Sequence, residues 1–470
     1  MTLHDIQQLC KEHGIRMIDF KMVDIDGRWR HLSIPVQRLT ENTLRYGIGF
    51  DGSNYGFAAV ENSDMVFVPD LRTAAIDPFL EVPTLSLQGD VMVIARPNNR
   101  PFEQYPRNVV QRAAEYLKET GIADEMILGP EYEFYVFDRV RFDTRPERLG
   151  YSIEAAQAEW SDGNNGYQTG HKAGYHSALP MDVHHDLRNR ICLHLEHWGI
   201  PVKYHHTEVG GCGQLEVEVE SGDLLTQADG TMIAKYVIKN TAVSCGKTAT
   251  FLPKPVANEA GSGMHVHMQL RKNGENLFYD PEGYGQLSKT ALYFIGGLLR
   301  HSASLCALTN PSTNSYKRLV PGFEAPVTVG YAMANRSAVV RIPAYAKSPA
   351  DKRFELRNPD ATCNPYYAYA AILMAGLDGI RNRIDPQQNG WGPYDLNLFD
   401  LPKEEKAKIG GLPKSLEEAL SALEQDHEYL LQGGVFSEQL LQLWIERKRR
   451  EAESIERTPH PLEFARYYDL

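Results

Sequence analysis

Carboxylate side chains recur in two stretches of the sequence that are otherwise typical of buried strands. In ILGPEYEFYVFD, residues 127–138, Glu131 and Glu133 are two positions apart, so on a strand both point to the same face. In YHHTEVGGCGQLEVEVE, residues 204–220, Glu208 and Glu216 flank a glycine-rich bend, and a hairpin there would bring the two carboxylates together. The pattern predicts several negative charges gathered on one interior face.

Three further strand-like stretches carry charged or imidazole side chains in the same way. They are GSGMHVHMQL with His265 and His267, KRFELRNPD with Arg353, Glu355 and Arg357, and SAVVRIPA with Arg341. Because an unpaired buried carboxylate is costly, such a set requires cations. Oxygen-rich ligation with one imidazole suits Mg²⁺ or Mn²⁺ better than zinc, and two such ions could bridge a phosphate. Any one stretch alone would be typical of an amphipathic strand; the combination of five favours a metal site.

Arginines gather in the following part of the chain. The stretches NPSTNSYKRLVPGFEAPV and YAMANRSAVVRIP contain Arg318, Arg336 and Arg341, and guanidinium groups bind phosphate and carboxylate oxygens in a forked geometry. Glu324 follows the turn dipeptide Pro-Gly, and a carboxylate on such a loop could act as a general base. Each arginine taken alone is typical of a surface salt bridge.

Composition limits the class of protein. Of the 470 residues, 42% are hydrophobic and 23% are charged, as in a globular protein with a sizeable core. The net charge of -12 argues against nucleic acid or an acidic membrane as a partner. No signal-peptide pattern and no stretch of membrane-spanning length is found. The six cysteines form no C-x-x-C pair, so we expect no disulfide framework and a cytoplasmic location.

The elements that must position these residues are predicted as α+β. The first hundred residues contain short strands separated by turns. The Pro- and Asn-rich segment 96–106 is predicted to connect two domains, at residues 1–100 and 101–470. Apolar periodicity then predicts helices over 106–120, 184–198, 223–245, 287–307, 364–382, 415–431 and 437–456.

Together these segments closely resemble type I glutamine synthetase. The likeness extends over nearly the whole chain, through GFDGS, NSDMVFVPD, GPEYEF, HHTEVGGCGQLE, GSGMHVHM, NSYKRLVPGFEAPV, NRSA, AILMAGLDGI, NLFDLP and HPLEFARYY. The resemblance implies an ATP-dependent ligase that makes glutamine from glutamate and ammonium through a γ-glutamyl phosphate. It implies a β-grasp N-terminal domain and a catalytic domain with a curved antiparallel sheet and flanking helices. It also implies a dodecamer of two stacked hexameric rings, with a C-terminal strap that inserts into the opposite ring.

The resemblance also implies roles for individual residues, through the motifs in which they stand. One metal would be held by Glu133, Glu208 and Glu216, and the other by Glu131, His265 and Glu355. Glutamate would be bound by Gly261, Arg318, Glu324, Arg336 and Arg357, and ATP by His267, Gln269, Arg341 and Arg353. The ammonium pocket would contain Asp51, which a neighbouring subunit supplies, with Ser53 and Tyr175. The resemblance implies that Asp51, Glu324 and Arg336 are catalytic.

Several positions depart from the family pattern. Phe399 stands in NLFDLP where some relatives have a tyrosine that is adenylylated, so we predict that this chain escapes that control. Ala260, Ser221, Gln269 and Ala334 replace residues that are common near glutamate or ATP in the family. These changes affect the nucleotide and amino-acid pockets and leave the metal positions intact.

Alternative functions remain open at this point. A γ-glutamyl ligase that uses a small amine or polyamine instead of ammonia would keep the metals and arginines, but the presence of Asp51, Tyr175 and Glu324 favours ammonia. A non-catalytic structural relative need not retain its metal carboxylates, and all six positions are present here. A kinase of the related guanidino class would have no use for the ammonium-side residues.

Overall fold

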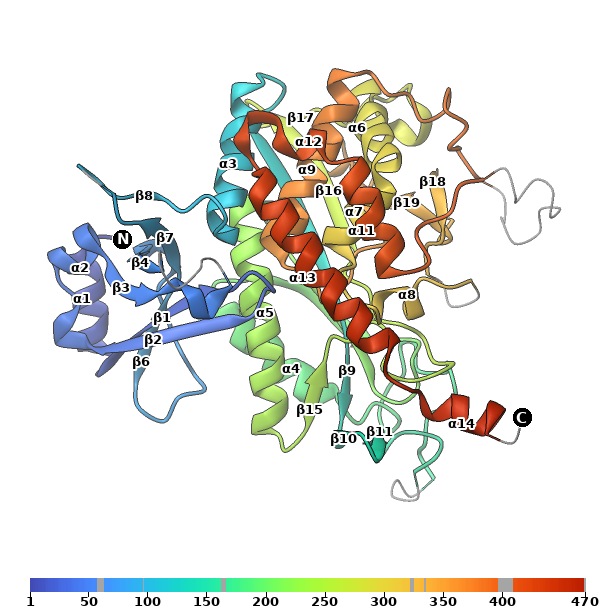
Figure 1. Cartoon of the computed structure of the whole chain (residues 1–470), viewed down its shortest axis with the longest axis horizontal. Coiled ribbons are helices and arrows are strands. Elements are labelled where there is room, and N and C mark those ends of the chain that lie inside the picture. Colours follow the sequence, from blue (N-terminus) through green and yellow to red (C-terminus); the bar gives the residue numbers. More distant parts are fainter. Residues whose placement is uncertain are drawn as a thin grey trace.

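The structure, a computed structural model, describes residues 1–56, 63–95, 97–161, 166–321, 325–333, 335–395 and 409–468 (Figure 1). The predictions made for Glu324, Ala334 and Phe399 lie outside these residues. The predicted α+β class is confirmed, with a smaller β-rich N-terminal unit beside a large mixed unit.

The N-terminal unit contains two four-stranded sheets. The first has the order β2-β1-β6-β5, formed by Trp29–Pro35, Met17–Val23, Thr84–Leu87 and Ala75–Ile76. The second has the order β3-β4-β7-β8, formed by Ile48–Asp51, Asp64–Pro69, Gly89–Val93 and Arg100–Pro101. Helices α1 (Leu3–Glu12) and α2 (Glu41–Tyr46) lie beside them. Thr2 is the N-cap of helix α1, and its hydroxyl accepts from the Asp5 N–H in a capping box.

The large unit is organised around one ten-stranded sheet. Its main path is β12-β13-β9-β16-β20-β19-β18, formed by Val202–Thr207, Gln214–Val219, Glu125–Phe137, Val266–Lys272, Phe354–Leu356, Ala338–Ile342 and Thr328–Met333. The short strands β14 (Gly222–Asp223) and β15 (Thr248–Thr250) pair with β9, and β17 (Glu275–Asn276) pairs with β16. The pairs are antiparallel as predicted, except that β18 and β19 are parallel. A separate hairpin is formed by β10 (Arg139–Arg145) and β11 (Arg148–Glu154).

The large unit also contains helices, and each predicted helix is found. They are α3 (Pro106–Glu119), α4 (His185–His197), α5 (Leu224–Ser244), α6 (Lys289–Arg300), α7 (Ser302–Thr309), α8 (Ser315–Arg318), α9 (Pro365–Arg381), α11 (Leu416–Gln425), α12 (Glu428–Leu431), α13 (Glu438–Glu456) and α14 (Pro461–Tyr467). Two predicted helices are interrupted: 287–307 forms α6 and α7, and 415–431 forms α11 and α12. Helix α9 is buried almost all round, as expected of a central core helix.

No helix in the described ranges is long and apolar enough by itself to cross a membrane; α6 and α7 reach that length and composition only as a pair, which is bent by 76°. Both helices are largely buried inside the protein.

Candidate active site

A cavity of about 1230 Å³ opens on one face of the large sheet. Twelve of the predicted site residues line it: Glu131, Glu133, Tyr175, Glu208, Glu216, Gly261, His265, Arg318, Arg336, Arg341, Glu355 and Arg357. They come from strands and loops that are far apart in the sequence, so the sheet order brings them together. Five of them sit on hydrogen-bonded strands, which fix their backbone positions: Glu131, Glu133, Glu216, Arg341 and Glu355.

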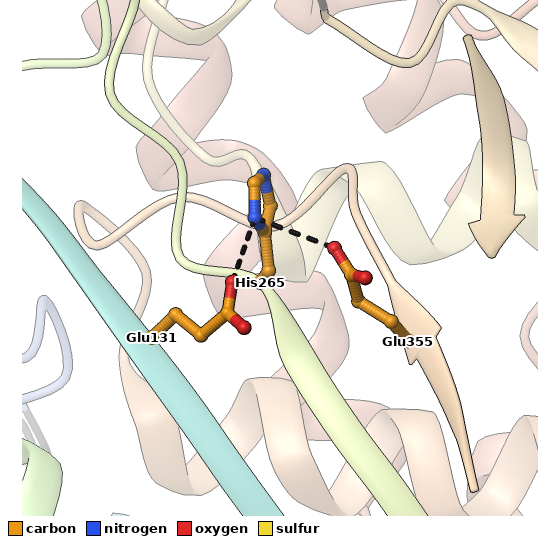
Figure 2. Close-up of side chains that lie close together, drawn as sticks. All are labelled: Glu131, His265 and Glu355. Atoms are coloured by element: carbon orange, nitrogen blue, oxygen red, sulfur yellow. Dashed lines mark hydrogen bonds and ion pairs between the residues drawn. The ribbon is translucent and has the colours of Figure 1, made fainter. Parts of the chain in front are cut away.

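Glu131, His265 and Glu355 form the first group of side chains in the cavity. Figure 2 shows the three side chains pointing toward one another from β9, from the residue before β16 and from β20. His265 Nδ1 lies 3.1 Å from Glu131 Oε2 and 3.5 Å from Glu355 Oε1. All three residues are buried, and one possible ligand atom from each lies within 4.8 Å of the others. The group matches the set predicted for one metal ion.

His206, Glu208 and Glu216 form the second group. His206 Nδ1 lies 3.8 Å from Glu208 Oε1, and His206 Nε2 lies 3.8 Å from Glu216 Oε1. In the sheet, Glu216 is paired with His206 on β12 and with Glu133 on β9. The Glu133 side chain also reaches the neighbouring loop, where its Oε2 accepts from the Gly263 N–H at 2.7 Å. Of the predicted set of three glutamates, Glu208 and Glu216 thus group with His206, which the sequence analysis did not single out, and Glu133 lies opposite Glu216 in the sheet.

The second missed residue is Glu218. It is buried, is paired with Glu131 across β13 and β9, and groups with Glu131 and Glu216. Its Oε2 accepts from Lys203 Nζ at 2.7 Å, and Tyr204 donates its hydroxyl to the other oxygen. The signal was present in the sequence, since LEVEVE has glutamates at every second position.

Burial and neighbouring charges shift the pKa values of these carboxyl groups. For Glu216, burial and the facing carboxylates of Glu131 and Glu133 raise the pKa well above its usual range. For Glu131, burial opposes ionisation, but the facing His267 and His265 rings lower the pKa well below its usual range. For Glu355, burial is likewise outweighed by Arg357, and the pKa is lowered. The site therefore has unequal charge compensation, with the excess of negative charge near Glu216.

The arginines are held against this carboxylate cluster. Arg341 Nη1 donates to Glu355 Oε2 at 2.7 Å, and Arg357 Nε lies 3.5 Å from Glu355 Oε1. Arg318 is buried and donates to the backbone carbonyls of Asn358 at 2.8 Å and Arg357 at 3.0 Å. A Cβ atom on Gly261 would lie 2.7 Å from Arg318 Cγ, so this position requires glycine for close approach.

Of the predicted residues that the structure describes, five lie outside the lining of the cavity: Asp51, Ser53, His267, Gln269 and Arg353. Asp51 is exposed on the N-terminal unit and accepts from the Ser53 N–H and hydroxyl at 2.9 and 2.7 Å. His267 borders the first group, with Nε2 2.7 Å from Glu131 Oε1. In the amide orientation that satisfies both ends, Gln269 contacts Asn276, Arg271 and the carbonyls of residues 350 and 352.

The donor set fits Mg²⁺ or Mn²⁺. Carboxylate oxygens dominate both groups and each contains one imidazole, which is ligation that these two ions accept. Within the described residues, the buried His267 Nδ1 makes no hydrogen bond, as expected where a further polar partner belongs.

Comparisons with known proteins agree with this geometry. The family described as "Glutamine synthetase, catalytic domain" matches residues 103–467, and "Glutamine synthetase, beta-Grasp domain" matches residues 14–94. A protein of Cupriavidus pinatubonensis named 3-hydroxylaminophenol mutase is 45% identical over 100% of this chain and 99% of its own. The glutamine synthetase of Frankia alni is 46% identical over 99% of each chain. The solved glutamine synthetase of Plasmodium falciparum has a TM-score of 0.88 at 28% identity and covers 100% of this chain and 99% of its own.

Proposed function

Because the chain belongs to the glutamine synthetase family, we propose that it is an ATP-dependent ligase that forms glutamine from glutamate and ammonia through a γ-glutamyl phosphate. The observation that carries this function is the convergence of two carboxylate–imidazole groups with arginines in one cavity. Such a cavity suits a reaction in which a phosphoryl group moves between two anions.

In this proposal the arginines divide between the two anionic substrates. Arg318 and Arg357, with Gly261, bind glutamate; both guanidiniums are buried, so water screens their charges little. Arg336 and Arg341 line the same cavity and stabilise the charge that spreads over the equatorial oxygens during phosphoryl transfer. Two Mg²⁺ or Mn²⁺ ions at the six predicted ligands, when bound, supply positive charge to the ATP phosphates. In the proposal, ATP is bound by His267, Gln269 and Arg353.

The proposed ammonium pocket contains Asp51, Ser53, Tyr175 and Glu324. An anionic pocket attracts ammonium, and a carboxylate accepts the proton that ammonium must lose before its nitrogen attacks. Asp51 does not line the cavity of its own chain, which is consistent with its acting in a neighbouring copy. We therefore include in the proposal a cytoplasmic dodecamer of two hexameric rings, and domains at 1–100 and 101–470. Exposed apolar side chains on α14 and at its C-cap support a contact with another copy: Leu462, Phe464, Tyr467 and Tyr468.

The test is a steady-state assay of phosphate release and glutamine formation with glutamate, ATP and Mg²⁺ or Mn²⁺. Ammonium is compared with methylamine and polyamines. 3-Hydroxylaminophenol is also tested, because one relative is named 3-hydroxylaminophenol mutase. Glu355→Gln should abolish turnover, whereas the matched change Glu275→Gln, at an exposed residue of β17, should not. Faster turnover with an amine, or conversion of 3-hydroxylaminophenol without glutamine formation, would overturn the proposal.

A further inference from the structure

The ring of His206 is held in place by aromatic neighbours on the wall of the cavity. Its centroid lies 4.5 Å from that of His176 in an edge contact, 5.6 Å from that of Tyr175 and 6.0 Å from that of Tyr204. His206 itself belongs to β12, where it is paired with Glu216 of β13. Ring contacts and strand pairing together restrict the ring to one orientation toward the carboxylates.

Nδ1 of this ring has a backbone partner and lies 3.8 Å from Glu208 Oε1, whereas Nε2 lies near Glu216. Nδ1 lies 3.1 Å from the carbonyl oxygen of Thr207, so the proton of the neutral ring belongs on Nδ1, which donates to that carbonyl. Nε2 then carries the lone pair and lies 3.8 Å from Glu216 Oε1, too far for a direct hydrogen bond. Histidines that bind metals commonly donate their other ring N–H to a backbone carbonyl or a carboxylate in this way.

The adjacent His205 shows that this arrangement is not general for histidines of β12. His205 Nδ1 accepts from Arg188 Nε at 3.0 Å, and its Nε2 lies 3.0 Å from Asn189 Oδ1. Both of its nitrogens are therefore used by the protein. The two neighbouring histidines therefore differ: His206 Nε2 lies 3.8 Å from Glu216 Oε1, whereas both nitrogens of His205 have other partners.

Glu133, the third glutamate predicted for this position, also contacts the neighbouring loop and His265. Its Oε2 accepts from the Gly263 N–H at 2.7 Å, and its Oε1 lies 3.6 Å from His265 Nε2. Among the described residues, the ligand atoms that lie within 4.8 Å of one another around Glu208 and Glu216 include His206.

We propose that His206 Nε2 binds one divalent cation together with Glu208 and Glu216. Each of the two metal positions then has one imidazole, from His206 at one and from His265 at the other. Because an imidazole strengthens binding of Mn²⁺ more than of Mg²⁺, His206 shifts this position toward Mn²⁺. The inference rests on the proposed function only in that a divalent metal belongs in this cavity.

The experiment measures metal binding without turnover. Mn²⁺ is titrated into the full-length protein at fixed pH, free Mn²⁺ is followed by electron paramagnetic resonance, and nitrogen couplings of bound Mn²⁺ are followed by spin-echo modulation. We expect two sites in the unchanged protein. His206→Gln should weaken one of them at least about 10- to 100-fold, remove one of two imidazole couplings, and change Mg²⁺ binding less. The same titration is made with His206→Asn, and the melting temperature of each metal-free variant is measured. A variant that misfolds is thereby recognised, and the other variant still tests the inference.

The matched control is His205→Gln, which should retain both sites and both couplings. Two sites of unchanged affinity and coupling in the His206 variants would overturn the inference and leave the proposed function standing. Equal losses in the His205 and His206 variants would also overturn it, because His206 would then act only through packing. If the unchanged protein binds no Mn²⁺ or Mg²⁺, the metal requirement of the proposed function fails as well.

Discussion

Replacing Gly261 with alanine tests how tightly the glutamate side of the cavity is built. A Cβ atom at this position would lie 2.7 Å from both Arg318 Cγ and the Pro253 carbonyl oxygen, and 3.0 Å from Arg318 Cβ. These atoms cannot rotate aside, because they belong to backbone or to the inner part of a side chain. Arg318 is further fixed by its hydrogen bonds to the carbonyls of Asn358 and Arg357.

The size of the effect follows from the displacement. To restore ordinary contact, Arg318 or the Pro253 backbone must move by about 0.7 Å. A misplacement of about 1 Å in a binding group can lower the rate by about 100-fold, so we expect kcat/KM for glutamate to fall about 10- to 100-fold. Overpacking should lower the free energy of unfolding by about 1–3 kcal/mol.

The assay is initial-rate kinetics with glutamate and ATP varied separately, together with denaturant unfolding. The loss should fall on glutamate, with a smaller change in KM for ATP. Gly150→Ala on β11 is the matched control, since its Cβ would meet no atom within 4 Å. Kinetics of Gly261→Ala indistinguishable from those of the unchanged protein, or a loss that falls equally on ATP, would refute the assignment of Gly261 and Arg318 to glutamate.

Three further predictions concern charge in the core. Glu216→Gln should raise the melting temperature of the metal-free protein, because it relieves repulsion between facing carboxylates, and should reduce the stabilisation by Mn²⁺; a lower metal-free melting temperature would contradict this. Arg107→Met leaves three aspartates without their buried guanidinium and should cost about 3–5 kcal/mol in denaturant unfolding, against less than about 1 kcal/mol for the exposed Arg72→Met. Burial opposes the charge of His301, but two facing aspartates raise its pKa. The stabilisation of the fold by the charged His301 ring is thus complete below about pH 6.5 and is lost as pH rises through the raised pKa. The melting temperature of the unchanged protein should therefore exceed that of His301→Gln by less at pH 9 than at pH 6.

The sequence predicted much of the site because strand periodicity is simple. Glu131 and Glu355 were expected to face a common space, and the structure places them on either side of His265. The glycine-rich bend was expected to fold the Glu208 and Glu216 segments into a hairpin, which β12 and β13 form. These predictions needed only a two-residue repeat and a turn, both of which are local properties of the chain.

The parts that were missed depend on long-range register. His206 lies opposite Glu216, and Glu218 lies opposite Glu131, only because β13 pairs with β12 and β9 in one particular register. A shift of one residue would turn Glu218 to the other face, and a single sequence does not specify which register holds. Gln269 was assigned to ATP by resemblance and its amide contacts the backbone of residues 350 and 352; the assignment stays a prediction.

The charges of the cavity also indicate where a substrate cation is needed. Glu218 has the ammonium of Lys203 at 2.7 Å, and Glu355 has the guanidinium of Arg341 at 2.7 Å. Glu133 and Glu208 each accept from a backbone N–H group and lie beside the rings of His265 and His206. The raised pKa of Glu216 reflects burial and the negative charges that remain around it. Because a low-dielectric cavity strengthens such a field, the side nearest Glu216 is where a divalent metal ion and an ammonium substrate gain most by binding.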